Sequence, residues 1–210
     1  FNNILMAVTG NVSMAKVNLS PDSASYTSLV EAEHACLRAK QLTWQLLTFS
    51  KGGVPVKKQT ALDGLLRESA ARTLRGTSAT CTFDITSDLE TVSADESQLL
   101  QVFSNLLINA QEAMPHGGSI QIKATNVVER ERRFEHALQV EAGTYVRVSI
   151  TDAGLGIPKE NVGRIFDPYF STKQRGSGLG LATSYSIVKN HGGFLTVDSK
   201  VGLGTTLHVH

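Results

Sequence analysis

The chain has 210 residues, of which 41% are hydrophobic, and its 20 basic and 19 acidic side chains give a formal net charge of +1. This length suffices for one globular domain with a smaller module, and the nearly balanced charge excludes the broadly basic surface of proteins that bind nucleic acid. Two cysteines in unrelated contexts indicate reduced thiols and a cytoplasmic location. No apolar run is long enough to span a bilayer, so we expect no direct membrane contact here, although a longer protein could be anchored elsewhere.

The first fifty residues contain two series of apolar residues at helical spacing. One series consists of Phe1, Leu5, Val8, Val12, Ala15 and Leu19, and a second, after the breaker SPDSAS, consists of Ala35, Ala39, Leu42, Leu46 and Phe49. Two helices joined by a short turn predict an antiparallel hairpin, which alone buries too little apolar surface to be stable. We therefore expect residues 1–53 to be a dimerisation hairpin, two copies of which form a four-helix bundle in a homodimer; packing of the hairpin on the remaining domain of the same chain is the alternative.

From Val54 onward, strand and helix patterns alternate irregularly. The predicted strands lie at residues 56–60, 79–86, 90–94, 119–128, 145–151, 194–199 and 205–209, and the predicted helices at 62–74, 95–114 and 179–190. The mixed-charge stretch 129–136 is expected to be a solvated hairpin end. Residues 54–210 are thus predicted to be a second domain, an α+β sandwich with helices on one face of a mixed sheet.

Two glycine-rich stretches carry candidate chemistry. DAGLGIP, Asp152–Pro158, sets a carboxylate beside two glycines, a weak signal alone because glycine serves many turns. RGSGLGLA, Arg175–Ala182, runs into a predicted helix just after Lys173, and backbone N–H groups at a helix start with nearby cations suit phosphate. Its spacing matches neither a P-loop nor a Rossmann fingerprint.

The long predicted helix contains NLLINAQEA, which presents Asn105 and Asn109 four residues apart on one face. Asparagine is a mediocre helix former, so this pair calls for a reason. Hydrogen bonds to neighbouring backbone are one reason. Coordination of Mg²⁺, which prefers hard oxygen ligands such as a side-chain carbonyl, is the other.

Together with IFDPYFSTK, Ile165–Lys173, these stretches resemble in order and spacing the catalytic domain of sensor histidine kinases. NLLINA resembles the N box, DAGLGIP the G1 box, FDPYF the F box, GSGLGLA the G2 box and GLGTT the last glycine element. The resemblance covers essentially the whole chain and implies the Bergerat ATP-binding sandwich shared with gyrase, the heat-shock chaperone of ninety kilodaltons and mismatch-repair ATPases. It implies ATP and Mg²⁺ as cofactors.

By this resemblance, the residues at the adenine end of the site are Asp152, Gly154, Gly156, Ile157 and Thr205. Asp152 would accept a hydrogen bond from the adenine amino group, and the two glycines would let the backbone approach the base. Ile157 would help to wall the base. Thr205 would assist at the adenine end, and Thr206 is the competing candidate for this role.

The residues implied at the phosphate end are Asn105, Asn109, Lys173, Arg175, Gly176, Gly178, Leu179 and Gly180. Asn109 would hold Mg²⁺, Lys173 and Arg175 would face the phosphates as catalytic residues, and the glycines would line a lid. Many relatives carry a basic residue three positions after the Mg²⁺-binding asparagine, where this chain has Glu112. Lys173 or Arg175 would then carry more of the phosphate contact.

The first stretch, FNNILMAVTGNVSMAKVNL, resembles the phosphoacceptor helix of a kinase subgroup whose motif reads H-D-F-N-N. The acceptor His and the Asp that follows it would lie immediately upstream of Phe1, so we expect the chain as given to bind Mg·ATP and dimerise without phosphorylating itself. In related kinases an Asn or Thr four residues after the acceptor His orients a water that dephosphorylates the partner. The count leads to Asn3, which is the candidate for such a phosphatase role.

The implied reaction is transfer of the γ-phosphoryl group of ATP to that His and then to an Asp of a response-regulator receiver domain. Two alternatives stay open. A hydrolytic ATPase of the same superfamily would use a Glu four residues before the Mg²⁺-binding asparagine, and Asn105 at that position disfavours it. A regulatory dimerisation module without kinase activity is disfavoured by the presence of Asn109, Asp152 and the glycine boxes.

Overall fold

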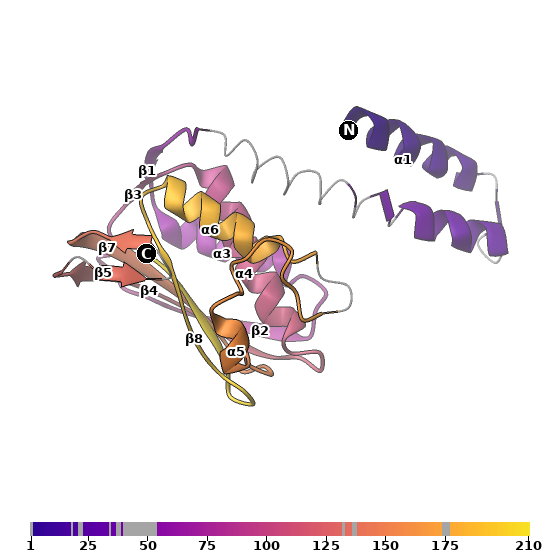
Figure 1. The fold of residues 1–210 in the computed structure, drawn as a ribbon. Helices are drawn as coiled ribbons and strands as arrows, with labels where there is room; N and C mark the ends of the chain where they lie inside the picture. The colour runs from indigo at the N-terminus through magenta and orange to yellow at the C-terminus, as the bar shows by residue number, and fades with distance from the viewer. Residues whose placement is uncertain are drawn as a thin grey trace. The chain divides into compact units, whose positions relative to one another are not determined.

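The structure is a computed structural model that describes residues 2–17, 19–20, 23–33, 35–36, 39, 54–131, 133–135, 138–173 and 177–210. The chain divides into two compact units, Phe1–Lys51 and Gly52–His210 (Figure 1). The second half of the predicted hairpin seam, Leu42, Leu46 and Phe49, lies outside the described residues.

The first unit is a helical hairpin. Helix α1 spans Asn2–Val17, and helical residues resume at 24–33, where the hydroxyl of Ser23 caps the new helix by accepting a hydrogen bond from the backbone N–H of Tyr26 at 3.1 Å. Glu33 reaches back to α1: it accepts a hydrogen bond from Ser13 at 2.7 Å and pairs with Lys16 at 2.5 Å. The second helix therefore folds back along α1, and the predicted helical hairpin is confirmed.

The second unit is built on a five-stranded mixed sheet with the order β2-β4-β7-β9-β8. Its strands are β2 (Ala79–Ile85), β4 (Gly118–Glu129), β7 (Gly143–Asp152), β8 (Leu195–Lys200) and β9 (Gly204–Val209). β2 pairs with β4 in parallel, and the other pairs are antiparallel. Along β4, buried Ile120, Ile122 and Ala124 alternate with exposed Gln121 and Lys123, so only one face of the sheet is buried.

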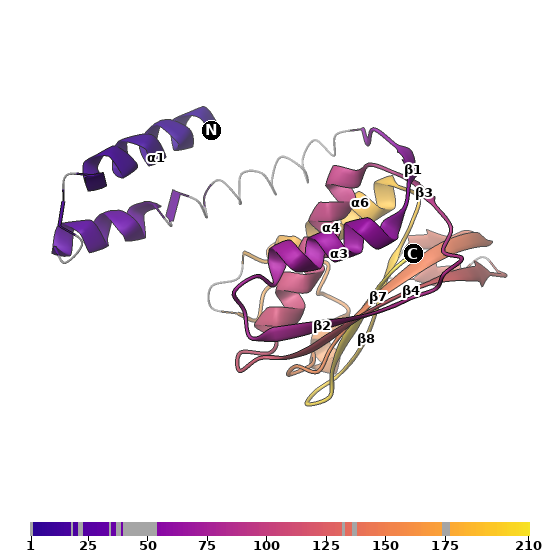
Figure 2. The ribbon, with the colours of Figure 1, turned by 180° about the vertical axis from the view of Figure 1, so that it is seen from behind.

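Three helices cover that face: α3 (Leu62–Thr73), α4 (Glu96–Glu112) and α6 (Gly180–Asn190). Both ribbon views show them on the same side of the sheet (Figures 1 and 2). α4 supplies the centre of the core, because its Val102, Phe103, Leu106 and Leu107 are almost completely buried. The predicted α+β sandwich with helices on one face of a mixed sheet is confirmed.

Five short elements complete the described part of this unit. The mixed-charge stretch forms part of a separate antiparallel pair, β5 (Arg133–Glu135) with β6 (Leu138–Val140), so it is a hairpin as predicted. Helix α5 (Lys159–Val162) follows the DAGLGIP stretch and was not predicted. A small ladder pairs β1 (Lys58–Thr60) with β3 (Val92–Ala94).

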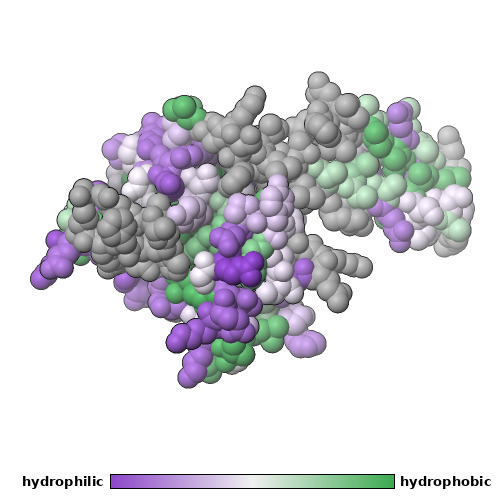
Figure 3. Space-filling model, viewed as in Figure 1, coloured by the Kyte–Doolittle hydropathy of each residue, from purple (hydrophilic) through white to green (hydrophobic). Residues whose placement is uncertain are grey.

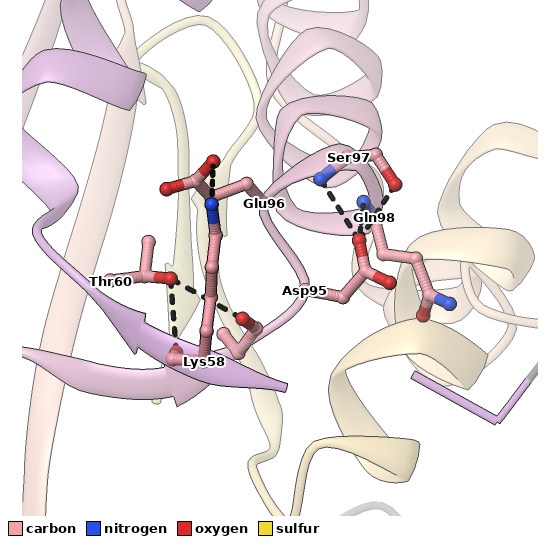
Figure 4. A network of polar contacts seen from close by, with 7 residues as sticks. Lys58, Thr60, Asp95, Glu96, Ser97 and Gln98 are labelled. Atoms are coloured by element: carbon pink, nitrogen blue, oxygen red, sulfur yellow. Dashed lines mark hydrogen bonds and ion pairs between the residues drawn. The ribbon is translucent and has the colours of Figure 1, made fainter. Parts of the chain in front are cut away.

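The β1–β3 ladder leads directly into α4 (Figure 4). Asp95 caps the helix, because its Oδ1 accepts hydrogen bonds from the backbone N–H groups of Ser97 at 3.0 Å and Gln98 at 3.2 Å. One residue later, Glu96 pairs with Lys58 of β1 at 2.8 Å. The start of α4 is thus fixed to the strand through which the chain enters this unit.

His191, the C-cap of α6, fixes the same point from the other side. Its Nε2 accepts a hydrogen bond from the backbone N–H of Asp95 at 3.0 Å, and its Nδ1 lies 2.8 Å from the carbonyl oxygen of Ile187. The neutral ring with its proton on Nδ1 satisfies both contacts. The first turn of α4 and the last turn of α6 are therefore joined through one imidazole.

Candidate functional site

The two asparagines of α4 have different surroundings. Asn105 is 9% exposed, and its amide nitrogen donates hydrogen bonds to the carbonyl oxygen of Gly180 at 3.1 Å and to the hydroxyl of Ser184 at 3.3 Å. Asn109, one turn later, is half-buried. Asn105 thus connects α4 to α6, while Asn109 has access to solvent at the C-terminal end of the same helix.

Asp152 ends strand β7 and is buried, with 6% of its surface exposed. Its Oδ1 accepts a hydrogen bond from the backbone N–H of Gly154 at 2.9 Å, and its register partner on β9 is Thr205. Burial raises the pKa of this carboxyl, while the N–H groups of Gly154 and Thr205 and the charge of Lys173 act in the opposite direction. The carboxylate is therefore held in a desolvated position with backbone donors around it.

The loop after Asp152 packs closely against two other segments. A Cβ on Gly154 would lie 2.6 Å from the carbonyl oxygen of Ala113, at the C-cap of α4, and the N–H of Leu155 donates to the same oxygen at 3.2 Å. Gly156 has a φ of +70°, and a Cβ there would lie 2.6 Å from the carbonyl carbon of Lys200. Both positions need glycine because the loop touches backbone on both sides.

Ser199 on β8 connects the remaining residues at this end. Its hydroxyl accepts a hydrogen bond from the backbone N–H of Ile157 at 2.8 Å and lies 2.9 Å from the hydroxyl of Thr205. Thr205 is buried beside Asp152, whereas Thr206 lies on the other face and bonds to Thr151 at 3.0 Å. The sequence gives no signal for Ser199, because its role depends on contacts across the sheet.

The segment between the F box and α6 makes a tight backbone crossing. The N–H of Tyr169, which has a φ of 65°, donates to the carbonyl of Gly178 at 3.0 Å. Gly178 has a φ of +66°, and a Cβ there would lie 2.5 Å from the carbonyl carbon of Tyr169. Leu179 is fully buried, and Gly180 begins α6. Arg175 and Gly176 lie outside the described residues.

Lys173 forms an ion pair that sequence reasoning missed. Its Nζ lies 2.5 Å from Oε2 of Glu112, the last residue of α4. Glu112 occupies the position at which many relatives carry a basic residue. The structure thus joins the segment that follows the F box to the C-terminal end of α4. The charge of Lys173 also favours the ionised form of Asp152, against the larger effect of burial, which raises the pKa of that carboxyl.

A cavity of about 340 Å³ opens beside this end of the sheet, lined by Asp152, Ser199, Gly204, Thr205 and their neighbours. Another of about 370 Å³, between α3 and β2, contains none of the predicted site residues. Within the described part of the chain no three His, Cys, Asp or Glu side chains cluster to hold a metal ion.

Residues 94–210 match the family model described as histidine kinase-, DNA gyrase B-, and HSP90-like ATPase. The chain therefore belongs to this family, and these residues are its ATP-binding domain. They include the candidate residues at both ends of the site, from Asn105 to Thr205.

Two curated relatives that match the full chain are a sensor kinase and a sporulation kinase. Sensor kinase CckA of Brucella abortus is 35% identical over 214 residues, and sporulation kinase E of Bacillus subtilis is 27% identical over 212. These matches cover 100% and 99% of this chain but only 22% and 26% of the relatives. The resemblance to sensor histidine kinases is confirmed.

Solved structures agree with the fold. ShkA in complex with AMPPNP has a TM-score of 0.74 at 20% identity, covering 99% of this chain and 43% of that one. The catalytic domain of the histidine kinase ThkA has a TM-score of 0.57 at 28% identity, covering 73% and 93%. In the described part of this chain, no helix is long and apolar enough to cross a membrane.

Proposed function

We propose that this chain is the core of a two-component sensor histidine kinase that binds Mg·ATP, directs the γ-phosphoryl group to a His, and passes it to an Asp of a response regulator. The observation that carries the proposal is the position of Asp152. This buried carboxyl lies beside Thr205 and is followed by a loop packed on the end of α4, the helix that carries Asn109.

At the adenine end, the carboxylate of Asp152 accepts a hydrogen bond from the amino group of the base. Its burial makes this acceptor selective, because a ligand that offers no donor leaves part of the hydrogen-bonding capacity of a desolvated carboxylate unsatisfied. Gly154 and Gly156 let the loop after Asp152 pack against Ala113 and Lys200, and Ser199 holds Ile157 and Thr205 in register. These contacts support adenine as the recognised base.

At the phosphate end, the side-chain oxygen of Asn109 is the protein ligand for Mg²⁺, which neutralises phosphate oxygens when it is bound. The residues fit this ion, because Asn109 is half-buried on a helix with an acidic side chain three residues on and offers a hard oxygen. Lys173 and Arg175 face the phosphates and stabilise the charge of the transferred group. Gly176, Gly178, Leu179 and Gly180 shape the lid and the start of α6.

We assign residues 1–53 to the dimerisation hairpin and residues 54–210 to the ATP-binding domain. The hairpin forms a homodimer, because α1 leaves Met6, Val8, Met14 and Val17 exposed, and Figure 3 shows hydrophobic side chains gathered on this unit. Such a surface is buried in a four-helix bundle. The core uses cytoplasmic ATP and serves a receiver domain; the structure of ThkA in complex with the response regulator TrrA offers a relative with such a partner.

Calorimetric titration of ATP with and without Mg²⁺ tests the proposal. The wild-type chain should bind ATP more tightly with Mg²⁺, and Asn109→Ala should lose this Mg²⁺ dependence while keeping its binding of metal-free ATP. Gln111→Ala, another half-buried amide of α4, is the matched control and should behave as wild type. Absence of Mg·ATP binding by the wild-type chain would favour the regulatory module without kinase activity.

A hydrolytic ATPase is the second candidate, and the surroundings of Asn105 speak against it. The amide of Asn105 donates to Gly180 and Ser184, and an amide cannot serve as the general base that would activate water. An upstream-extended chain should therefore transfer phosphate to its His and show little release of free phosphate. Rapid multiple-turnover hydrolysis without phosphohistidine would reverse this choice.

Asn3 is proposed to orient the water that dephosphorylates the response regulator. It lies in the first turn of α1, which follows the inferred acceptor His. An upstream-extended protein with Asn3→Ala should autophosphorylate normally and dephosphorylate its regulator more slowly. An unchanged dephosphorylation rate would remove this role and leave the kinase assignment intact.

A further inference from the structure

The Glu112–Lys173 ion pair joins two segments 61 residues apart in the chain. Glu112 ends α4, and Lys173 belongs to the loop after the F box. The side chains are 45% and 40% exposed, and the Nζ to Oε2 distance is 2.5 Å. The charge of Lys173 also acts on Asp152. The lysine that the proposed function places beside the phosphates is thus held by a carboxylate at the end of α4.

Glu112 lies three residues after Asn109 and so projects from the same side of α4. If phosphates approach Asn109, the carboxylate of Glu112 is the nearest anion on that helix and repels them. It also holds the lysine that the phosphates need. A phosphate group and the Glu112 carboxylate thus compete for the same ammonium group.

We propose that Glu112 is an affinity-determining residue that holds Lys173 when the site is empty and loses it to the phosphates when a nucleotide binds. This inference rests on the proposed function, because it requires phosphates beside Lys173. The exchange involves only ion pairs, with no covalent step. This exchange lowers the affinity for nucleotide. It also favours release of ADP, since the ion pair between Glu112 and Lys173 forms again as the phosphates leave.

The size of the effect follows from the exposure of the pair. An ion pair exposed to this degree changes an equilibrium by no more than about fivefold. Glu112→Gln should therefore tighten ATP binding by about two- to fivefold at low salt. The gain should shrink toward zero at about 1 M salt, where the screening length falls to about 3 Å.

The experiment compares the dissociation constants of ATP and of adenosine for wild type, Glu112→Gln, Lys173→Met and the double variant. Glu112→Gln should tighten ATP and leave adenosine unchanged, because adenosine has no phosphates. Lys173→Met should weaken ATP, and Glu112→Gln in that background should add less than about twofold. Glu96→Gln is the matched control, because Glu96 is the first residue of α4, is 44% exposed and pairs with Lys58. It should leave both constants unchanged.

Four outcomes overturn the inference. They are weaker or unchanged ATP binding by Glu112→Gln, an equal gain for adenosine, an equal gain without Lys173, and an equal gain with the Glu96→Gln control. A wild-type chain that fails to bind Mg·ATP would instead refute the proposed function. The two failures are therefore distinguishable in one set of titrations.

Discussion

The side-chain amide of Asn105 donates a hydrogen bond to the carbonyl oxygen of Gly180 at 3.1 Å, across 75 residues of sequence. Gly180 is the first residue of α6, and the same amide also reaches Ser184 in the next turn. The N box helix and the helix after the glycine-rich lid are thus connected by one buried polar group. The contact therefore fixes the helix that carries Asn109 against the helix that follows the second glycine-rich stretch.

Replacement of Asn105 by Ala should destabilise the ATP-binding domain by about 1–3 kcal/mol, because buried polar groups on α6 lose a partner. Urea denaturation measures the change in the free energy of unfolding. Ser104→Ala, at a half-buried neighbour on the same helix, should change it by less than about 1 kcal/mol. Equal effects of the two variants would show that the contact does not stabilise the domain.

The spacing of the two asparagines alone offered two reasons for the pair and did not say which reason applied to which residue; only the family resemblance assigned Mg²⁺ to Asn109. Spacing places Asn105 and Asn109 on one face of a helix, but only packing against α6 distinguishes the buried residue from the accessible one. The same limit explains Ser199 and Glu112, whose partners lie across the sheet or in the loop before the lid. Contacts distant in sequence leave no local pattern.

The sheet and the long helices were predictable, because their periodicity is strong. The alternation along β4 and the apolar face of α4 each extend over many residues. Helix α5 has four residues, which is too short for a helical period, so it was missed. The glycine boxes were predictable as a set because their order, rather than any one motif, is specific.

Asp152 should make stability fall as the pH rises. Burial raises the pKa of this carboxyl, so the folded protein keeps the proton to a higher pH than the unfolded chain does. Between the ordinary value of 3.8 and the raised folded pKa, the folded state binds more protons, and its stability declines with rising pH. Asp152→Asn lacks this decline, so its stability relative to wild type should increase from pH 4 toward neutral, as measured by urea denaturation at a series of pH values.

The same variant should bind ATP at least about tenfold more weakly, because a hydrogen bond to a charged acceptor contributes about 1.5–3 kcal/mol. A variant whose stability relative to wild type rises toward neutral pH while its ATP affinity falls would separate the functional role of Asp152 from a structural one. Undiminished ATP affinity in Asp152→Asn would contradict the adenine contact.

Asp95 should show the opposite pH dependence. The side-chain hydrogen bond from Ser97 is the largest cause of its lowered pKa, and the N–H groups of Val56, Gln98 and Ser97 add to it. A carboxyl whose folded pKa is depressed stabilises the protein above the unfolded pKa, and this stability is lost as the pH falls through the folded pKa.

Asp95→Asn keeps the cap of α4 but cannot titrate, so its difference from wild type should vanish at low pH. Asp95→Ala loses the cap as well and should cost about 1 kcal/mol more than Asp95→Asn at neutral pH. Thermal unfolding between pH 3 and 7 measures both differences. A constant difference between wild type and Asp95→Asn over this range would contradict the titration.

Gly156 should be far less tolerant of alanine than Gly163, seven positions away in the chain. At Gly156 the φ of +70° disfavours any L side chain by about 1–2 kcal/mol, and a Cβ would also lie 2.6 Å from the carbonyl carbon of Lys200 and 3.0 Å from Cα of Val201. At Gly163 the φ is −69° and nothing lies within 4 Å of the added Cβ. Gly156→Ala should therefore cost more than about 2 kcal/mol, whereas Gly163→Ala should be neutral or stabilising by up to about 1 kcal/mol.

The loop at Gly156 continues from Asp152, so its displacement should also weaken ATP binding. Urea denaturation and ATP titration of the two variants measure both effects. If Gly156→Ala unfolds, titration of the variant at a lower temperature, where the folded state persists, still reports the affinity. Equal stability and equal affinity of the two alanine variants would show that the close approach of this loop to the β8–β9 turn is not required, and the recognition of the base would then have to depend on Asp152 alone.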